Sequence, residues 1–125
     1  MRGNEHADLL RRHLMALEAR DWEGFAATLH PDVVHEVPQT RERVTGRAAY
    51  LRLTRRGRGD WHLSVRRVVA DEAGGLAWTD VSLGGESLAG LHVFTITDGL
   101  VSRVDDFWPE PYDPPDERSH LVERF

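Results

Sequence analysis

The most regular pattern of apolar and polar positions runs from Leu88 to Trp108, on both sides of Asp98-Gly99. Alternation of this kind is typical of half-buried strands, and Asp-Gly is typical of a tight turn, so the stretch predicts a long β-hairpin. A three-residue loop over 97–99 separates apolar from polar residues best. One face then carries Leu88, Gly90, His92, Phe94, Ile96, Leu100, Ser102, Val104, Asp106 and Trp108.

In this register His92 lies opposite Val104, and Gly90 lies opposite Asp106. His92 and Asp106 are then diagonal neighbours, about 7–8 Å apart at the backbone. A two-residue loop would shift the register by one and place His92 beside Asp105. The outward positions are also apolar, namely Leu91, Val93, Val101 and Phe107. We therefore expect a homodimer that packs sheet to sheet, because an exposed apolar face favours association.

The remaining elements follow from the same patterns. Apolar residues at helical spacing predict helices over about 5–20, 21–29 and 47–56. Alternation predicts strands over 33–37, 61–70 and 76–83. In the second of these strands Trp61, Leu63, Val65 and Val69 share a side, and in the third Trp78 and Asp80 share one.

The order of elements is helix, helix, strand, helix and a meander of four long strands. This order predicts an α+β fold, in which a strongly curved, mostly antiparallel sheet forms a cone with three helices over its open end. The length of 125 residues indicates a single domain over 1–125. Its last part, 109–125, is a Pro-rich tail that is expected to be extended.

Composition narrows the possible chemistry. The chain has no Cys and no Lys, so all sixteen basic residues are Arg. This excludes thiol nucleophiles, thiolate metal sites, Schiff-base lysines and the P-loop lysine. The seven His residues lack ligand spacing. We therefore expect neither a metal nor a cofactor, and chemistry that comes from His, Asp, Glu, Tyr, Ser or Arg.

The charge pattern bears on partners. A net charge of −5 disfavours nucleic-acid binding, and no apolar run approaches the roughly 20 residues of a membrane span. The N-terminus lacks the apolar segment of a signal peptide, so a cytoplasmic location without membrane contact is expected. The stretch Arg52–Arg67 holds six Arg and one acid. It is expected to be a solvated face, with an anionic partner as the alternative.

The predicted hairpin face carries a carboxylate among apolar residues. Asp106 lies between Val104 and Trp108, and a buried carboxylate must be paired, hydrogen-bonded or protonated. His92 on the same face makes a His–Asp acid–base pair possible. The candidate catalytic residues are Asp106, Asp80, His92 and His35, and the candidate pocket walls are Trp78, Trp108, Phe94 and Tyr50.

From about Ala7 to Trp108, the order of elements, the Asp-Gly hairpin and the closing D-[FY]-[FW] pattern resemble SnoaL-like domains of the nuclear transport factor 2-like superfamily. That superfamily includes polyketide cyclases, ketosteroid isomerase, scytalone dehydratase and limonene epoxide hydrolase, together with non-enzymatic binding and assembly domains. The resemblance implies a cone-shaped fold around one cavity, and it leaves the activity open.

The hairpin VFTITDGLVSRVDDFW is similar to that of limonene epoxide hydrolase. This similarity implies that Asp106 and Asp80 match the two catalytic acids of that family. The Arg that bridges those acids is replaced by Trp78, which breaks the relay. The catalytic Tyr and Asp of ketosteroid isomerase would fall near Leu14 and at Val37, so that chemistry is not expected.

The sequence points to two functions. The first is a pocket for a small, largely hydrophobic molecule with cofactor-free proton transfer, as in hydrolysis, dehydration, isomerisation or cyclisation. It requires Asp106 to be reachable through the pocket mouth and to have a raised pKa. The alternative is a non-catalytic ligand-binding or dimerisation module, in which Asp106 can be sealed and ion-paired.

Overall fold

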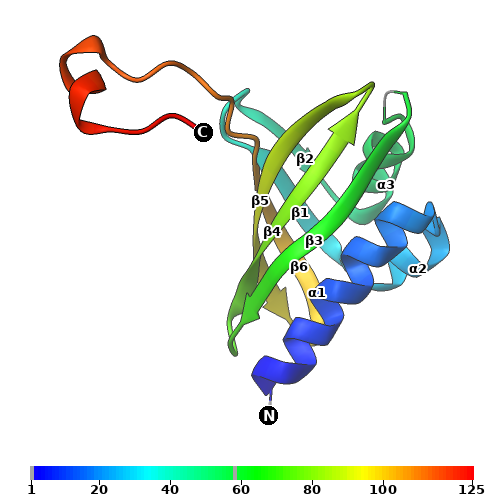
Figure 1. Ribbon diagram of the computed structural model, residues 1–125. Coiled ribbons are helices and arrows are strands. Elements are labelled where there is room, and N and C mark those ends of the chain that lie inside the picture. The colour runs from blue at the N-terminus through cyan, green and yellow to red at the C-terminus, as the bar shows by residue number, and fades with distance from the viewer. Residues whose placement is uncertain (1, 58) are drawn as a thin grey trace.

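The computed structural model describes residues 2–57 and 59–125, and its centre is one six-stranded curved sheet (Figure 1). The elements are α1 (Arg2–Ala19), α2 (Trp22–Ala27), β1 (Leu29–Val37), β2 (Glu42–Thr45), α3 (Arg47–Arg55), β3 (Trp61–Ala70), β4 (Gly74–Leu83), β5 (Glu86–Thr97), β6 (Leu100–Phe107) and a 3₁₀ turn, η1 (Asp116–Leu121). The strand order is β2-β1-β6-β5-β4-β3; β1 and β6 are parallel neighbours, and the other neighbouring pairs of the described strands are antiparallel. The predicted α+β fold is confirmed.

The three α-helices gather on one side of the curved sheet (Figure 1). α1 packs on β3 and β4, and α3 packs on β1. Between helices and sheet lies the apolar core, built from residues such as Leu10, Leu14, Phe25, Val33 and Val104, which are at most 1% exposed. No helix in the described part of the chain is long and apolar enough to cross a membrane.

The first strand is longer than predicted. β1 begins at Leu29, four residues before the predicted start of the strand, and it contains Pro31. The pairing of β1 with β6 shifts register between Leu29 and Val34, and Pro31 lies in this interval, where its missing N–H breaks no ladder hydrogen bond. The short strand β2 was not predicted, because its four residues are largely exposed and lack an apolar face.

The hairpin of β5 and β6 corrects the predicted register. Its loop has two residues, because Thr97 pairs with Leu100, and a β-bulge then leaves Ser102 without a register partner on β5. After the bulge, His92 lies directly opposite Asp106 rather than opposite Val104. The bulge also turns Val101 inward, where it is fully buried, so its expected place on the outer face is wrong.

A second irregularity changes the inner face of β3. Its pairing with β4 shifts between Val65 and Arg67, so Val68 is buried and Val69 is exposed. The prediction that Val69 shares a side with the earlier apolar residues of this strand is therefore wrong. The Pro-rich tail runs away from the end of the sheet, coloured orange to red in Figure 1, and it is largely exposed.

Candidate functional site

A cavity of about 350 Å³ lies between the inner face of the sheet and the helices. Its wall is mainly apolar and includes Trp108, Phe94 and Tyr50. The polar groups on this wall come from separate elements: His13 from α1, His35 from β1, Tyr50 and Thr54 from α3, His92 from β5 and Asp106 from β6. An apolar cavity with few polar groups is typical of a small-molecule site.

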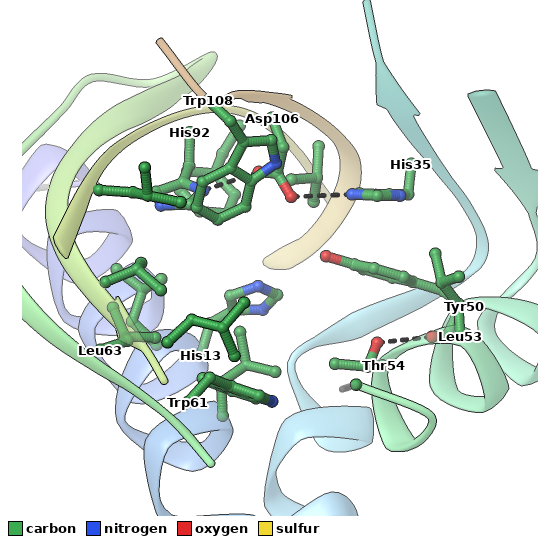
Figure 2. Close-up of a pocket in the computed structure, with 18 residues that line it drawn as sticks. His13, His35, Tyr50, Leu53, Thr54, Trp61, Leu63, His92, Asp106 and Trp108 are labelled. Atoms are coloured by element: carbon green, nitrogen blue, oxygen red, sulfur yellow. Dashed lines mark hydrogen bonds and ion pairs between the residues drawn. The ribbon is translucent and has the colours of Figure 1, made fainter. Parts of the chain in front are cut away.

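Asp106 lies between two imidazoles (Figure 2). Its Oδ2 is 2.8 Å from His35 Nε2, and its Oδ1 is 2.7 Å from His92 Nδ1. Both contacts follow from the register, since β6 lies between β1 and β5 in the sheet. The three side chains are buried, with Asp106 9% exposed and each histidine 6% exposed.

The pKa of Asp106 reflects two opposing effects. Burial by itself raises the pKa, but the hydrogen bonds from His35 and His92 outweigh it and lower the pKa of Asp106 to about 2. The catalytic interpretation of the sequence required a raised pKa for Asp106, so the lowered pKa agrees instead with the alternative interpretation, in which Asp106 is ion-paired. The carboxylate is ionised at neutral pH because two N–H groups point at it.

The ionised carboxylate fixes the protons on its neighbours. A carboxylate can only accept, so both His35 Nε2 and His92 Nδ1 must donate. The other nitrogen of His92, Nε2, lies 2.8 Å from Thr79 Oγ1. Thr79, His92 and Asp106 thus follow the order of a nucleophile–histidine–acid triad. Thr79 has no exposed surface, so its hydroxyl orients His92 and cannot reach a substrate.

Tyr50 places a hydroxyl in the same cavity. Its ring stacks on His35 with centroids 4.6 Å apart and an interplanar angle of 15°. Figure 2 shows its oxygen pointing into the cavity, on the side of Asp106 and His35. Burial, and secondarily the charge of Asp106, raises the pKa of Tyr50 well above its usual value. The group therefore remains a hydrogen-bond donor.

Gly90 makes room for this arrangement. A Cβ at this position would lie 2.6 Å from Thr79 Oγ1 and 2.9 Å from both His92 Nε2 and Trp108 Cζ3. The Trp108 ring meets His92 edge to face, with centroids 5.4 Å apart. Gln39 holds the backbone of Trp108 from the other side, since its amide donates to the Trp108 carbonyl over 2.9 Å. Any side chain at position 90 would displace one of these partners.

The structure places two candidate residues elsewhere. Trp78 and Asp80 lie outside the cavity, because Ala77 and Thr79 are the buried residues of this part of β4. Trp78 is 41% exposed, and Asp80 accepts a hydrogen bond from Arg66 Nε over 2.5 Å. The prediction that Trp78 forms a pocket wall is wrong, and the position of Asp80 does not support a catalytic role.

The model of the SnoaL-like domain matches residues 10–104, which is most of the chain. The chain belongs to the SnoaL-like domain family. Among curated proteins, no sequence matches it.

Several solved structures resemble this SnoaL-like domain. A proposed ketosteroid isomerase from Kribbella flavida DSM 17836 is 48% identical, with a TM-score of 0.96 over 98% of this chain and 91% of that one. An NTF-2 like protein of unknown function from Burkholderia xenovorans LB400 is 21% identical, with a TM-score of 0.84 over 98% of this chain and 96% of that one. An LEH-like epoxide hydrolase from M. tuberculosis is 23% identical, with a TM-score of 0.74 over 87% of this chain and 86% of that one. The last two show the fold alone.

Two buried polar residues beside the cavity of this SnoaL-like domain were not identified from the sequence. His13 lies one residue before Leu14, on the buried side of α1, and its helical spacing from Leu9 and Leu10 could have revealed it. Thr79 faces inward on β4. The sequence had instead suggested that its neighbour Trp78 faces inward, because Trp78 is the more apolar of the two. Both residues hydrogen-bond within the wall of the site, His13 to Thr28 and Thr79 to His92.

Among the described residues, no group of three His, Asp or Glu side chains could hold a metal ion. Asp106 lies between the two imidazoles and bonds directly to both. What this arrangement can do is accept or release a proton beside an apolar space, while the buried charge stays hydrogen-bonded.

Proposed function

We propose that this SnoaL-like domain is a cofactor-independent enzyme that moves a proton on a small, largely apolar molecule with one carbonyl group. The observation that carries the proposal is the ionised Asp106, held by His35 and His92 in the wall of an apolar cavity of about 350 Å³. Desolvated acid–base groups in such a cavity are typical of active sites.

Asp106 is the base in this proposal. Each of its oxygens accepts one hydrogen bond, which leaves lone pairs for a proton from the substrate. Its pKa of about 2 keeps it in the base form, but it also makes Asp106 a weak base. A weak base suits a substrate whose proton is already acidified, such as a proton on the carbon next to a carbonyl.

Tyr50 supplies the activation that a weak base requires. Its hydroxyl points into the cavity and stays protonated, so it can donate a hydrogen bond to the carbonyl oxygen. That bond strengthens as negative charge develops on the oxygen, and such donors lower barriers substantially. The name of the relative that is 48% identical, a proposed ketosteroid isomerase, supports this type of reaction over epoxide opening. In this proposal Tyr50 and Asp106 take the roles of the catalytic Tyr and Asp of ketosteroid isomerase, at whose expected positions this sequence has Leu14 and Val37.

The test follows exchange of carbon-bound protons in D₂O by NMR, with 1-tetralone and 2-cyclohexenone as probes. Wild type should accelerate loss of the proton next to the carbonyl. Asp106→Asn should reduce the rate at least about 100-fold, and Tyr50→Phe should reduce it about 10- to 100-fold. Asp105→Asn is the matched control, because Asp105 is the next residue on β6 but lies outside the cavity. Equal rates for wild type and Asp106→Asn would refute the assignment.

A non-catalytic ligand-binding module is the second candidate. The observation in its favour is that the carboxylate already has a partner on each oxygen and a lowered pKa, as a structural ion pair has. This alternative predicts that ligands raise the melting temperature of wild type without any proton exchange. A ligand at 100 times its Kd would stabilise the fold by about 2.7 kcal/mol.

A further inference from the structure

One polar atom on the cavity wall, Nε2 of His13, has no role in the proposed proton transfer. His13 on α1 lines the cavity and is only 1% exposed. Its ring projects into the same space as Asp106 and Tyr50 (Figure 2). A buried polar ring at the wall of an apolar cavity needs a partner for each nitrogen.

The hydrogen bonds around His13 fix its tautomer. Thr28 Oγ1 donates its single proton to the Phe25 carbonyl over 2.7 Å. In the 2.9 Å contact between Thr28 Oγ1 and His13 Nδ1, the hydroxyl must therefore accept and Nδ1 must donate. The proton of the neutral ring is on Nδ1, so Nε2 carries a lone pair.

The Nε2 atom is the free end of this ring. Among residues 2–57 and 59–125 it has no hydrogen-bond partner, and no fully buried side-chain nitrogen or oxygen of these residues is unsatisfied. The small exposure of His13 therefore includes Nε2. The ring cannot easily turn, because the rings of Phe25 and Phe94 pack against it, with centroids 4.7 and 5.3 Å from that of His13. Burial lowers the pKa of His13 to about 3, so the ring is neutral at physiological pH.

We propose that His13 Nε2 is a second ligand anchor, which accepts a hydrogen bond from a hydroxyl or N–H group of the bound molecule. The inference rests on the proposed function for the location of the ligand, and it adds the substrate class. The substrate is an apolar carbonyl compound that also carries a donor group, and the carbonyl faces Tyr50 while the donor faces His13. A ligand with an acceptor at that end, such as an ether or a second ketone, is disfavoured, because two lone pairs would face each other.

The test compares 1-tetralone with its 5-, 6- and 7-hydroxy and 6-methoxy derivatives by calorimetry. Wild type should bind at least one hydroxylated ketone about tenfold more tightly than 1-tetralone, and it should gain nothing from the methoxy group. His13→Phe should bind 1-tetralone and the hydroxylated ketones equally. A wild type without a hydroxyl preference, or a preference that persists in His13→Phe, would overturn the proposal.

A second measurement is independent of how well the variant folds. NMR of protein with ¹⁵N-labelled histidine should show the His13 proton on Nδ1 and an unprotonated Nε2, whose signal shifts when the hydroxylated ketone binds. A proton on Nε2 in the free protein would overturn the proposal. The two proposals also fail separately. A hydroxyl preference without proton exchange refutes the reaction but not the anchor, and exchange without a hydroxyl preference refutes the anchor alone.

Discussion

Asp105 and Asp106 are consecutive residues of β6, and they lie in opposite chemical environments. Asp106 faces the cavity, where both of its partners are imidazoles. Asp105 faces outward, where the guanidinium of Arg103 donates to both of its oxygens over 2.9 and 3.0 Å. The difference follows from the pleat of one strand, which sends successive side chains to opposite faces.

The contrast extends to the neighbouring strand. His35 on β1 serves the inner network, and the next residue, Glu36, serves the outer one by accepting from Arg43 and Arg103. An Arg remains charged at any physiological pH, so the outer acids are held in fixed ion pairs. The inner carboxylate is paired instead with two imidazoles, and all three side chains line the apolar cavity. The comparison suggests that the inner network serves chemistry and the outer one serves the surface.

The largest expected effect is a loss of folding stability at low pH, and we assign it to His13 in the cavity wall. The unfolded chain protonates His13 below its usual pKa of 6.5, but the folded chain does so only near pH 3, so stability falls as the pH drops through this window. His13 should cost wild type about 3 kcal/mol between pH 7 and pH 4. Urea unfolding at both pH values should show a smaller pH dependence in His13→Gln.

The control for this prediction is His62→Gln. His62 is exposed, and a hydrogen bond to Glu18 raises its pKa, so its contribution has the opposite sign. That contribution is present at low pH and is lost as the pH rises through the folded pKa. An equal reduction of the acid sensitivity in both variants would contradict the assignment to His13.

The next effect separates the two aspartates. Asp106→Asn removes a buried charge that two N–H groups satisfy, and it should cost about 2 kcal/mol at pH 7. The contribution of Asp106 is fully present above its usual pKa of 3.8 and is lost as the pH falls toward 2. Asp105→Asn weakens an ion pair at the surface and should cost less than about 1 kcal/mol. Chemical denaturation measures both, and equal losses would remove the distinction between the faces.

The smallest effect on the stability of the fold concerns the outer face. Trp78 and Val93 are 41% and 38% exposed there, which supports the proposal of a homodimer through the sheet. Sedimentation at micromolar concentration should show a dimer for wild type and a shift to monomer for Trp78→Asp, with less than about 0.5 kcal/mol lost in unfolding. Tyr112→Asp in the exposed tail is the control. A monomeric wild type would contradict the proposal.

Much of this fold could be predicted from apolar spacing, because β3 to β6 alternate and α1 has helical periodicity. The bulges could not be predicted, since periodicity gives the face of a residue but not its partner across the ladder. Asp106 and His92 were thus expected on the same face but in the wrong pairing. In β4, the inward face was assigned to the large Trp78 rather than to the small Ala77. In the structure, burial follows the space available between helix and sheet, so Ala77 is buried and Trp78 is exposed.

The bulge at Ser102 has a consequence for how this strand tolerates insertions and deletions. Ser102 has no register partner on β5, although its hydroxyl bonds to Thr95 and Thr97, so the bulge is equivalent to one extra codon. Loss of that codon would leave Thr95 opposite Arg103 and His92 opposite Asp106. The strand would become regular, and the carboxylate would still face the cavity. Relatives that are one residue shorter at this point are therefore expected to keep the same inner network, and a comparison of their lengths in this hairpin would reveal it.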